Sequence, residues 1–337
     1  MVHAHERSHG KATQKPIDVR PTLQSIHETH EYSDSMARFG WDIEYPLLSS
    51  SPIDCQTATL AFPAWQIRRE NRATGDVLLH GRTASDRCTI CLPTFERAGT
   101  HLNGVPVGGS EAHLYISELD IHGVALAPLG SVTVHIDNQW LHRELPSSIS
   151  GLLSEALGSA HKQALSIPHA PASALVDINA LFDSSSTELL SLRNARLSLE
   201  RVFLSMITET LLLHATEHDS LSPNLLCAQE VRAHIDANLH RPLRLSELEQ
   251  HFRVSSRTIQ RWFQEAFAIT PREYILTCRL HRARQRLLRS VHSRHARAPV
   301  SSIARSVGFT HMGRFSASYK QRFGQLPTET RSLSRIG

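Results

Sequence analysis

Long apolar runs are absent from this 337-residue chain. A membrane-spanning helix needs about 18 or more consecutive apolar residues, and no stretch approaches that length. The sequence also lacks the apolar core that marks a secretory signal peptide. Its five cysteines are too unevenly spaced for a disulfide framework. We therefore expect a cytoplasmic protein that does not contact a membrane.

The residue patterns of enzymes and metal sites are also missing. No Ser/His/Asp or paired-carboxylate pattern stands out. Cys88 and Cys91 form a Cys-x-x-Cys pair in an alternating stretch, where a spacing of three places side chains on opposite faces of a strand. The histidines near the N-terminus match no compact metal site; they are His3, His5, His9, His27 and His30. We expect no catalytic residue, metal or cofactor, and a redox role for the cysteine pair stays open.

Lysine is almost missing from the C-terminal third, whereas arginine is abundant there. Residues 221–337 contain 19 Arg and 1 Lys against 7 Asp and Glu, a net charge of +13, while the rest of the chain carries −9. Arginine suits forked contacts with phosphate and guanine. A solvated charged surface is the alternative, but the asymmetry favours a C-terminal part that alone contacts a polyanion.

Short alternating stretches separated by Gly and Pro occupy residues 39–140. The predicted strands are TATLAF, WQIRRE, DVLLHG, RCTICLP, AHLYISEL, IHGVALAP and SVTVHID. No helical pattern separates them, which favours an antiparallel barrel or sandwich. A small barrel can hold one small ligand, although no residue indicates which. The polar residues 1–35 before this region are expected to form a flexible tail.

Helical patterns follow the predicted strands. Pro146–Ala160 fits one amphipathic helix, and a longer one over residues 187–217 has Ser186 as its N-cap. Apolar residues recur every seventh position in the longer helix, at Leu192, Leu199, Met206 and Leu213. This stripe fits either a coiled-coil seam in a homodimer or packing within the chain, and both stay open. The polar residues 218–223 are the predicted linker.

Two helix–turn–helix patterns joined by one long helix occupy residues 243–331. In the first, Ser246 and Glu249 fit a capping box. Its second helix places Ile259, Trp262 and Phe263 inward and leaves an Arg-bearing face exposed. In the second pattern Gly308 makes the turn, and Pro327 begins the last helix. Exposed polar helices of this kind enter the major groove of DNA.

These patterns resemble the DNA-binding domain of the AraC/XylS transcription regulators. The residues that carry the resemblance are Ser255, Arg257, Thr258, Phe263, Thr270, Pro271, Tyr274, Arg279, Leu280, Ala283, Arg284, Ile303, Ala304, Gly308, Phe309, Phe315, Tyr319, Phe323, Gly324 and Pro327. The run GFTHMGRFSASYKQRFGQLP is similar to the benzoate-responsive XylS branch and to ethanolamine-operon activators. The resemblance covers about a third of the chain.

The resemblance implies an α+β protein of two domains: a β-rich, barrel-like (cupin-like) sensor domain with trailing helices, and an all-α tandem helix–turn–helix domain. The expected segments are a tail at 1–35, a sensor and dimerisation domain at 36–217, the linker at 218–223 and the DNA-binding domain at 224–337. The expected partners are promoter DNA, RNA polymerase and a small-molecule effector. The effector is unidentified; the similar branches suggest an aromatic acid or a small amine.

The resemblance also assigns DNA contacts residue by residue. The expected base-reading residues are Arg257, Gln260, Arg261, Met312, Gly313, Arg314 and Ala317. The expected phosphate contacts are Ser255, Thr258, His311 and Lys320. Because Gly313 and Ala317 lack polar groups, the second helix would depend on Arg314, methyl contacts or DNA shape.

Two positions depart from the family pattern. Glu249 stands where Ala is common, which predicts looser packing in the first unit. Ala268 stands where Gly is common, which predicts strain in a left-handed C-cap.

The leading interpretation is a small-molecule-responsive transcription activator. One alternative is a repair or metal-sensing enzyme fused to a DNA-binding domain, which would require a reactive or zinc-bound cysteine. Another is a dimeric repressor that needs no effector.

Overall fold

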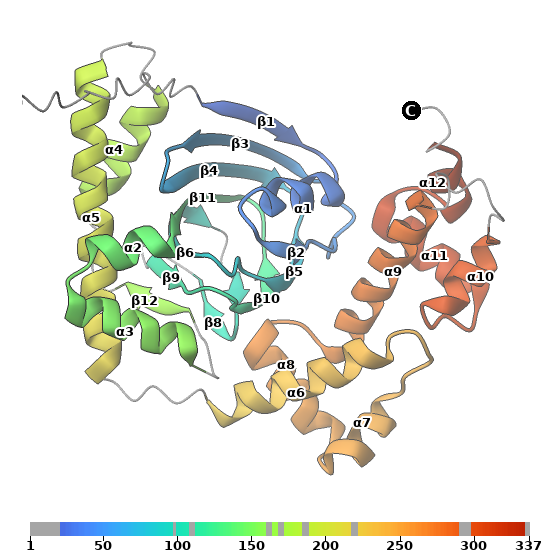
Figure 1. The fold of residues 1–337 in the computed structure, drawn as a ribbon. Coiled ribbons are helices and arrows are strands. Elements are labelled where there is room, and N and C mark those ends of the chain that lie inside the picture. Colours follow the sequence, from blue (N-terminus) through green and yellow to red (C-terminus); the bar gives the residue numbers. More distant parts are fainter. Residues whose placement is uncertain are drawn as a thin grey trace, which may run out of the picture.

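The computed structural model describes residues 21–96, 99–107, 112–159, 164–167, 172–183, 189–216, 222–289 and 298–333. An N-terminal β-rich part carries helices on one side and adjoins an all-helical C-terminal part on the other (Figure 1). The expected combination of a β-rich part and a tandem helical part is confirmed.

A seven-stranded antiparallel sheet forms the larger layer of the β-rich part. Its order is β1-β3-β4-β11-β6-β9-β12. The strands are β1 (Thr22–Ile26), β3 (Asp54–Ala61), β4 (Trp65–Thr74), β6 (Arg87–Glu96), β9 (Ala112–Tyr115), β11 (Leu129–Asp137) and β12 (Leu165–Ile167). The alternating stretches predicted from the sequence supply most of these strands.

A five-stranded antiparallel sheet forms the second layer, in the order β2-β5-β10-β7-β8. Its strands are β2 (Asp42–Glu44), β5 (Val77–Arg82), β7 (His101–Leu102), β8 (Val105–Pro106) and β10 (Asp120–Ala125). Among the described strands neither sheet closes on itself. The layers are therefore open, and a closed, cupin-like barrel is not confirmed.

The two faces of the large sheet border different cores because successive side chains in a strand point to opposite faces. One core contains Ile67, Cys88 and Val134 and extends to the helices that follow the strands. The other lies between the sheets and contains Tyr32, Tyr45 and Ile121, with Cys91 packed against it. Cys88 and Cys91 thus lie on opposite faces, as their spacing predicts.

Helices α2 (Asn138–Glu144), α3 (Ser147–Gly158), α4 (Ala172–Asp183) and α5 (Leu189–Thr216) cover the outer face of the large sheet. In α5, Leu199 and Met206 are buried in this core, whereas Leu213 is 45% exposed. The side chain of Leu192 and the cap Ser186 lie outside the described part. The centre of the stripe, at Leu199 and Met206, therefore packs within the chain, which is one of the two alternatives that the sequence leaves open.

The segment predicted to be a flexible tail is ordered at its end. Strand β1 pairs with β3, and helix α1 (Thr29–Ala37) follows it. Tyr32 and Met36 of α1 are buried between the two sheets. The tail prediction is wrong for residues 22–35, because apolar side chains only four residues apart in a polar segment are enough to anchor a short helix.

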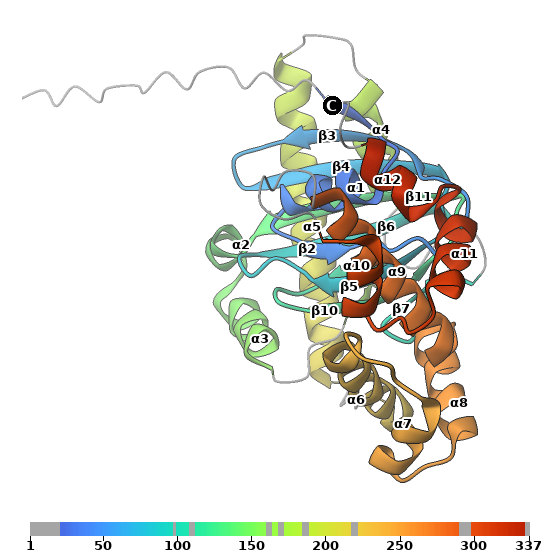
Figure 2. The ribbon, with the colours of Figure 1, turned by 90° about the vertical axis from the view of Figure 1, so that its right-hand side faces the viewer.

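Seven helices make up the described C-terminal part. They are α6 (Pro223–Asn238), α7 (Leu245–Phe252), α8 (Ser256–Phe267), α9 (Pro271–Arg289), α10 (Val300–Ser306), α11 (Met312–Phe323) and α12 (Pro327–Leu333). Helix α9 connects a first unit, α7–α8, to a second unit, α10–α11. Figure 2, seen from the side of the C-terminal helices, shows α9 in front of the β-rich part. Only Ser222 and Pro223 of the predicted linker are described, as the N-cap and first residue of α6.

The first unit shares its core with the β-rich part. Leu78 of β5 and Val124 of β10 pack in one cluster with Val231, Phe263 and Tyr274. The second unit has a separate core that includes Ile303, Phe315 and Tyr319. The first unit is thus fixed on the small sheet through buried apolar area, whereas the second contacts the β-rich part through polar side chains.

Candidate nucleic-acid interface

Two glutamate side chains of α7 stabilise the first unit, one at the start of α7 and one at the turn between α7 and α8. Glu247 Oε1 accepts a hydrogen bond from the backbone N–H of Arg244, which is the N-cap of α7, so the cap predicted at Ser246 is wrong by two residues. Glu249 Oε1 accepts from the N–H of Ser256 at 2.7 Å. The carboxylate thereby bridges the two helices, so Glu249 fastens the turn that it was expected to loosen.

Helix α8 presents a polar face to solvent. Ser255 is its N-cap, and its Oγ accepts from the N–H of Thr258. Ile259 and Phe263 are fully buried on the inner face. On the opposite face of α8, Arg257, Gln260 and Arg261 lie within about one helical turn of each other, and all three are exposed. The structure therefore brings the three predicted base-reading side chains of the first unit together on one free surface.

Helix α8 ends in the left-handed conformation predicted for it. Ala268 has φ +55° and donates its N–H to Gln264 O. A non-glycine residue in this region costs about 1–2 kcal/mol. The first unit keeps its C-cap despite this strain.

Helix α11, like α8, buries its aromatic side chains and exposes the opposite face, but that exposed face has fewer polar side chains. Phe315 and Tyr319 are buried, and Gly313, Arg314 and Ala317 are exposed. Met312 is only half-buried. Arg314 is thus the charged side chain among the predicted base-reading residues of the second unit.

The predicted phosphate contacts are distributed over both units. Ser255, His311 and Lys320 are exposed, and Thr258 is half-buried. The Oγ of Ser255 and the Oγ1 of Thr258 lie 3.0 Å apart and are already hydrogen-bonded to each other at the cap. His311 and Lys320 flank the exposed face of α11 at its start and two turns later.

Helix α9 sets the relative placement of the units. Its Tyr274 hydroxyl donates to Asp236 Oδ1 of α6 at 2.8 Å. Burial is the largest of the effects that raise the pKa of Tyr274 far above the ordinary value, so the hydroxyl stays protonated and donates. Arg279 donates from Nε to Leu239 O, and burial lowers its pKa. These bonds tie α9 to the end of α6.

Two arginines of the C-terminal part bind the β-rich part instead of solvent. Arg284 of α9 donates to both carboxylate oxygens of Glu28 at 3.1 and 2.9 Å. Arg322 of α11 is buried, donates to Leu47 O and pairs with Glu273 at 2.9 Å. The sequence carries a partial signal for this role, because Arg284 falls on the apolar side of α9, but it does not reveal the partners.

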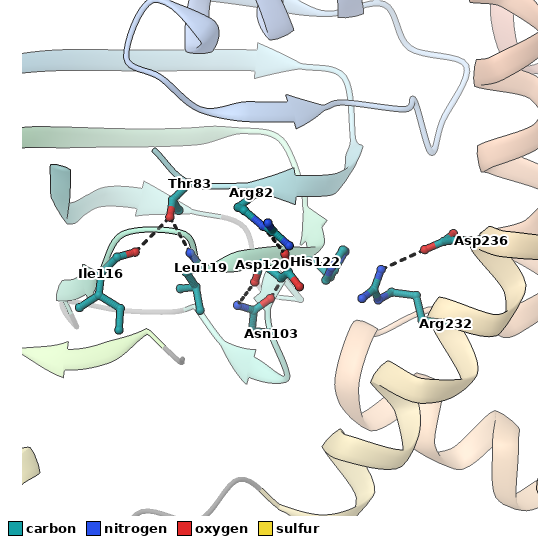
Figure 3. Close-up of polar contacts among 9 residues, drawn as sticks. All are labelled: Arg82, Thr83, Asn103, Ile116, Leu119, Asp120, His122, Arg232 and Asp236. Carbon is teal, nitrogen blue, oxygen red and sulfur yellow. Dashed lines mark hydrogen bonds and ion pairs between the residues drawn. The ribbon is translucent and has the colours of Figure 1, made fainter. Parts of the chain in front are cut away.

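A polar cluster lies where the small sheet meets α6 (Figure 3). Asn103 donates to Asp120 O and accepts from the N–H of His122, which fixes that strand end. Arg232 pairs with Asp236 at 2.9 Å within α6, on the side that faces His122. Burial, followed by the charge of Arg232, lowers the pKa of His122 well below its usual range. His122 is therefore neutral in this contact.

The described residues contain no cluster of three or more metal-ligating side chains. Within the same residues, no helix is long and apolar enough to cross a membrane.

Comparison with known proteins places the C-terminal units among transcription regulators. Residues 248–332 match the family described as "Helix-turn-helix domain". The chain is 36% identical over 103 residues to the HTH-type transcriptional regulator ArgR of Pseudomonas aeruginosa, a match that covers 31% of this chain and 30% of that protein. A solved AraC-type regulator from Chromobacterium violaceum is 28% identical and covers 32% of this chain and 92% of that one, with a TM-score of 0.28.

The chain is also 31% identical over 110 residues to the XylDLEGF operon transcriptional activator 2 of Pseudomonas putida. This match covers 33% of this chain and 68% of that relative. Other curated relatives match over only 28–37% of their own length. The family match at residues 248–332 covers most of the tandem unit described above, from α7 to α12. The chain belongs to the AraC/XylS family of DNA-binding transcription regulators.

Proposed function

We propose that the chain binds promoter DNA through α8 and α11 in two successive major grooves, and that it activates transcription together with RNA polymerase in response to a small molecule bound by the β-rich part. In this proposal residues 36–217 sense the effector and residues 224–337 bind DNA.

The observation that carries the proposal is the exposed face of α8. Arg257, Gln260 and Arg261 occupy positions i, i+3 and i+4 of one helix, so their side chains project in the same direction. Guanidinium groups form forked hydrogen bonds with guanine, and glutamine amides do so with adenine. The first unit accordingly reads bases directly.

The second unit is built for weaker base reading. Around Arg314, the exposed positions Gly313 and Ala317 offer no hydrogen-bonding side chain. Lys320 supplies a charge suited to phosphate. We therefore assign α11 mainly to positioning on the backbone, with one base contact from Arg314.

Replacement of Lys320 and of Arg314 by alanine, one at a time, tests this division of roles. Lys320→Ala is expected to weaken binding to all sequences alike and to reduce the slope of log K against log salt by about 1, because one phosphate contact is lost. Arg314→Ala is expected to relax the preference at one base position as well. Fluorescence anisotropy on a set of single-base variants at several salt concentrations measures both effects.

The matched control is Lys320→Arg, which keeps the charge and should keep the salt slope. Equal loss of base preference in Lys320→Ala and Arg314→Ala would contradict the assignment.

Direct contacts between the two parts support control by an effector. Glu28 and Glu44 of the β-rich part bind Arg284 and Gln285 of α9. A change in the β-rich part that moves these carboxylates therefore acts on the helix that joins both units. A reporter assay on the bound promoter separates an activator, whose loss lowers transcription, from a repressor, whose loss raises it.

A further inference from the structure

Three charged residues of β4 are buried between the two sheets. Arg68, Glu70 and Arg72 alternate along the strand and point to the same face. Their exposed fractions are 2%, 5% and 0%. Arg72 reaches across to the small sheet, where its Nη2 donates weakly to Ala125 O at 3.4 Å. A sheet face that packs against apolar side chains thus contains three full charges.

The positive charge of this cluster is not balanced. Glu70 pairs with Arg68 and also accepts a hydrogen bond from the Tyr32 hydroxyl. Although burial opposes ionisation, Arg68 and Arg72 lower the pKa of Glu70, so one negative charge is present. This one carboxylate faces the two guanidinium groups of Arg68 and Arg72. Among the described residues no second carboxylate binds either arginine.

Neighbouring titratable groups do not supply the missing negative charge. Burial raises the pKa of Tyr32, Tyr45 and Cys55, so these groups stay protonated and neutral. Burial also lowers the pKa of His135, which is neutral. The cluster therefore holds one uncompensated buried positive charge, which is strongly unfavourable unless it is paired.

The unpaired N–H groups belong to both arginines. Nε and Nη1 of Arg72 and Nε and Nη2 of Arg68 are buried without a hydrogen-bond partner. Water can satisfy an N–H group, but it cannot cancel the charge. A carboxylate does both, because its two oxygens accept the parallel N–H bonds of one guanidinium. A small amine carries the wrong charge for this site.

An aromatic ring contacts both guanidinium groups, and further aromatic rings lie in the same core. Arg68 and Arg72 each lie over the Tyr32 ring, at 5.6 and 5.7 Å from its centroid. Tyr32 stacks on Tyr45 at 4.0 Å. Phe39 stacks on the buried ring of His135. The surroundings of the charge therefore suit an apolar or planar body.

We propose that the space between the two sheets binds a small organic carboxylate, with its carboxylate paired to Arg72 and its apolar body among the aromatic side chains of α1 and its neighbours. This proposal rests on the proposed effector-responsive function and names the chemical class of the effector. Binding requires α1 to move, because Tyr32 now occupies part of this space and is hydrogen-bonded to Glu70.

The same helix connects the site to the C-terminal part. Glu28 is the N-cap of α1, one turn before Tyr32, and binds Arg284 of α9. The guanidinium of Arg284 also lies 4.8 Å from the ring centroid of Phe323 in α11. A carboxylate that displaces Tyr32 therefore shifts Glu28 and changes the support of the second unit.

Isothermal titration and thermal shift on the full chain test the site. The probes are acetate, hexanoate, octanoate and benzoate, with benzamide as the neutral and benzylamine as the cationic counterpart of benzoate. At least one carboxylate is expected to bind and raise the melting temperature, and neither counterpart should do so. Arg72→Met is expected to raise the melting temperature of the free chain, because it removes the unpaired charge, and to weaken carboxylate binding at least 100-fold.

Arg69→Met is the matched control, since the adjacent side chain points to the outer face, where it contacts Phe182 and Asn179. It should leave carboxylate binding within about twofold of the wild type. Glu28→Gln should keep carboxylate binding but lose the effect of the carboxylate on DNA affinity. Failure of every carboxylate to bind, or binding that is unchanged in Arg72→Met, overturns the proposal.

DNA binding is measured in the same samples. A chain that binds its DNA site but no carboxylate contradicts only this inference. A chain that does not bind a specific DNA site contradicts the proposed function itself.

Discussion

Alanine at both Arg257 and Arg261 is expected to weaken specific DNA binding about 100-fold. Both side chains are exposed on one face of α8, and a forked contact with guanine contributes about 1–3 kcal/mol of discrimination. Two such contacts near the lower end of that range amount to about 2.7 kcal/mol, which is a factor of about 100 in the dissociation constant. Nonspecific binding should weaken much less. Fluorescence anisotropy with the specific site and with a scrambled duplex measures the two constants.

The control removes the same charge from a different surface. Arg82→Ala combined with Arg201→Ala takes two exposed arginines from the β-rich part. Its specific binding should stay within about threefold of the wild type, because long-range charge effects are screened beyond about 10 Å at 0.1 M salt. A comparable loss in both double variants would show that net charge, and not base reading by α8, accounts for the affinity.

Alanine at Gly308 is expected to destabilise the second unit by roughly 2–5 kcal/mol. Gly308 has φ +88°, and an added Cβ would lie 2.6 Å from Leu239 O and 2.8 Å from Cζ of Arg279. Both groups belong to the hydrogen bond that ties α9 to α6, so neither can move cheaply. Hydrogen exchange of the full chain should show the slowest amides in residues 300–323 exchanging about 30-fold faster or more.

Gly151→Ala is the matched substitution at an unhindered site. Gly151 lies in α3, and a Cβ there meets nothing within 4 Å. Alanine should stabilise α3 by about 0.5–1 kcal/mol and leave residues 300–323 unchanged. Unaltered exchange in the Gly308 variant would mean that the turn relaxes without cost and that the contact with Arg279 is not needed for the second unit.

Local patterns in the sequence predict much of the fold. Alternation identifies strands such as β4 and β11, because an antiparallel strand with two different faces imposes a period of two. The left-handed end at Ala268 is equally local, since it depends on residues within one turn. The exposure of Arg257 and Arg261 follows from the helical period once Ile259 and Phe263 are placed inside.

Contacts between distant residues could not be predicted in this way. Glu28 and Arg284 are 256 positions apart, and no periodicity relates them. The burial of Leu199 depends on the large sheet beneath α5, and a heptad pattern alone does not distinguish that surface from a second subunit. Glu249 departs from the expectation because its partner is the backbone N–H of Ser256, across a turn whose geometry the sequence does not specify.

One long-range contact did leave a signal. Val77, Leu78 and Leu79 are consecutive and all buried, which breaks the alternation expected of a strand with one solvent face. An uninterrupted apolar run indicates a strand covered on both sides. The outer face of this strand is covered by the first helix–turn–helix unit, which packs on Leu78 and Val124.

Selection of binding sites from a random duplex library by the full chain is the most direct test of DNA reading by two unequal helices. The predicted result is a site with two conserved segments centred about 10–10.5 base pairs apart. The segment read by α8 should be strict and rich in G·C pairs, and the segment read by α11 should be permissive. A single conserved segment, or two segments of equal strictness, would contradict the account.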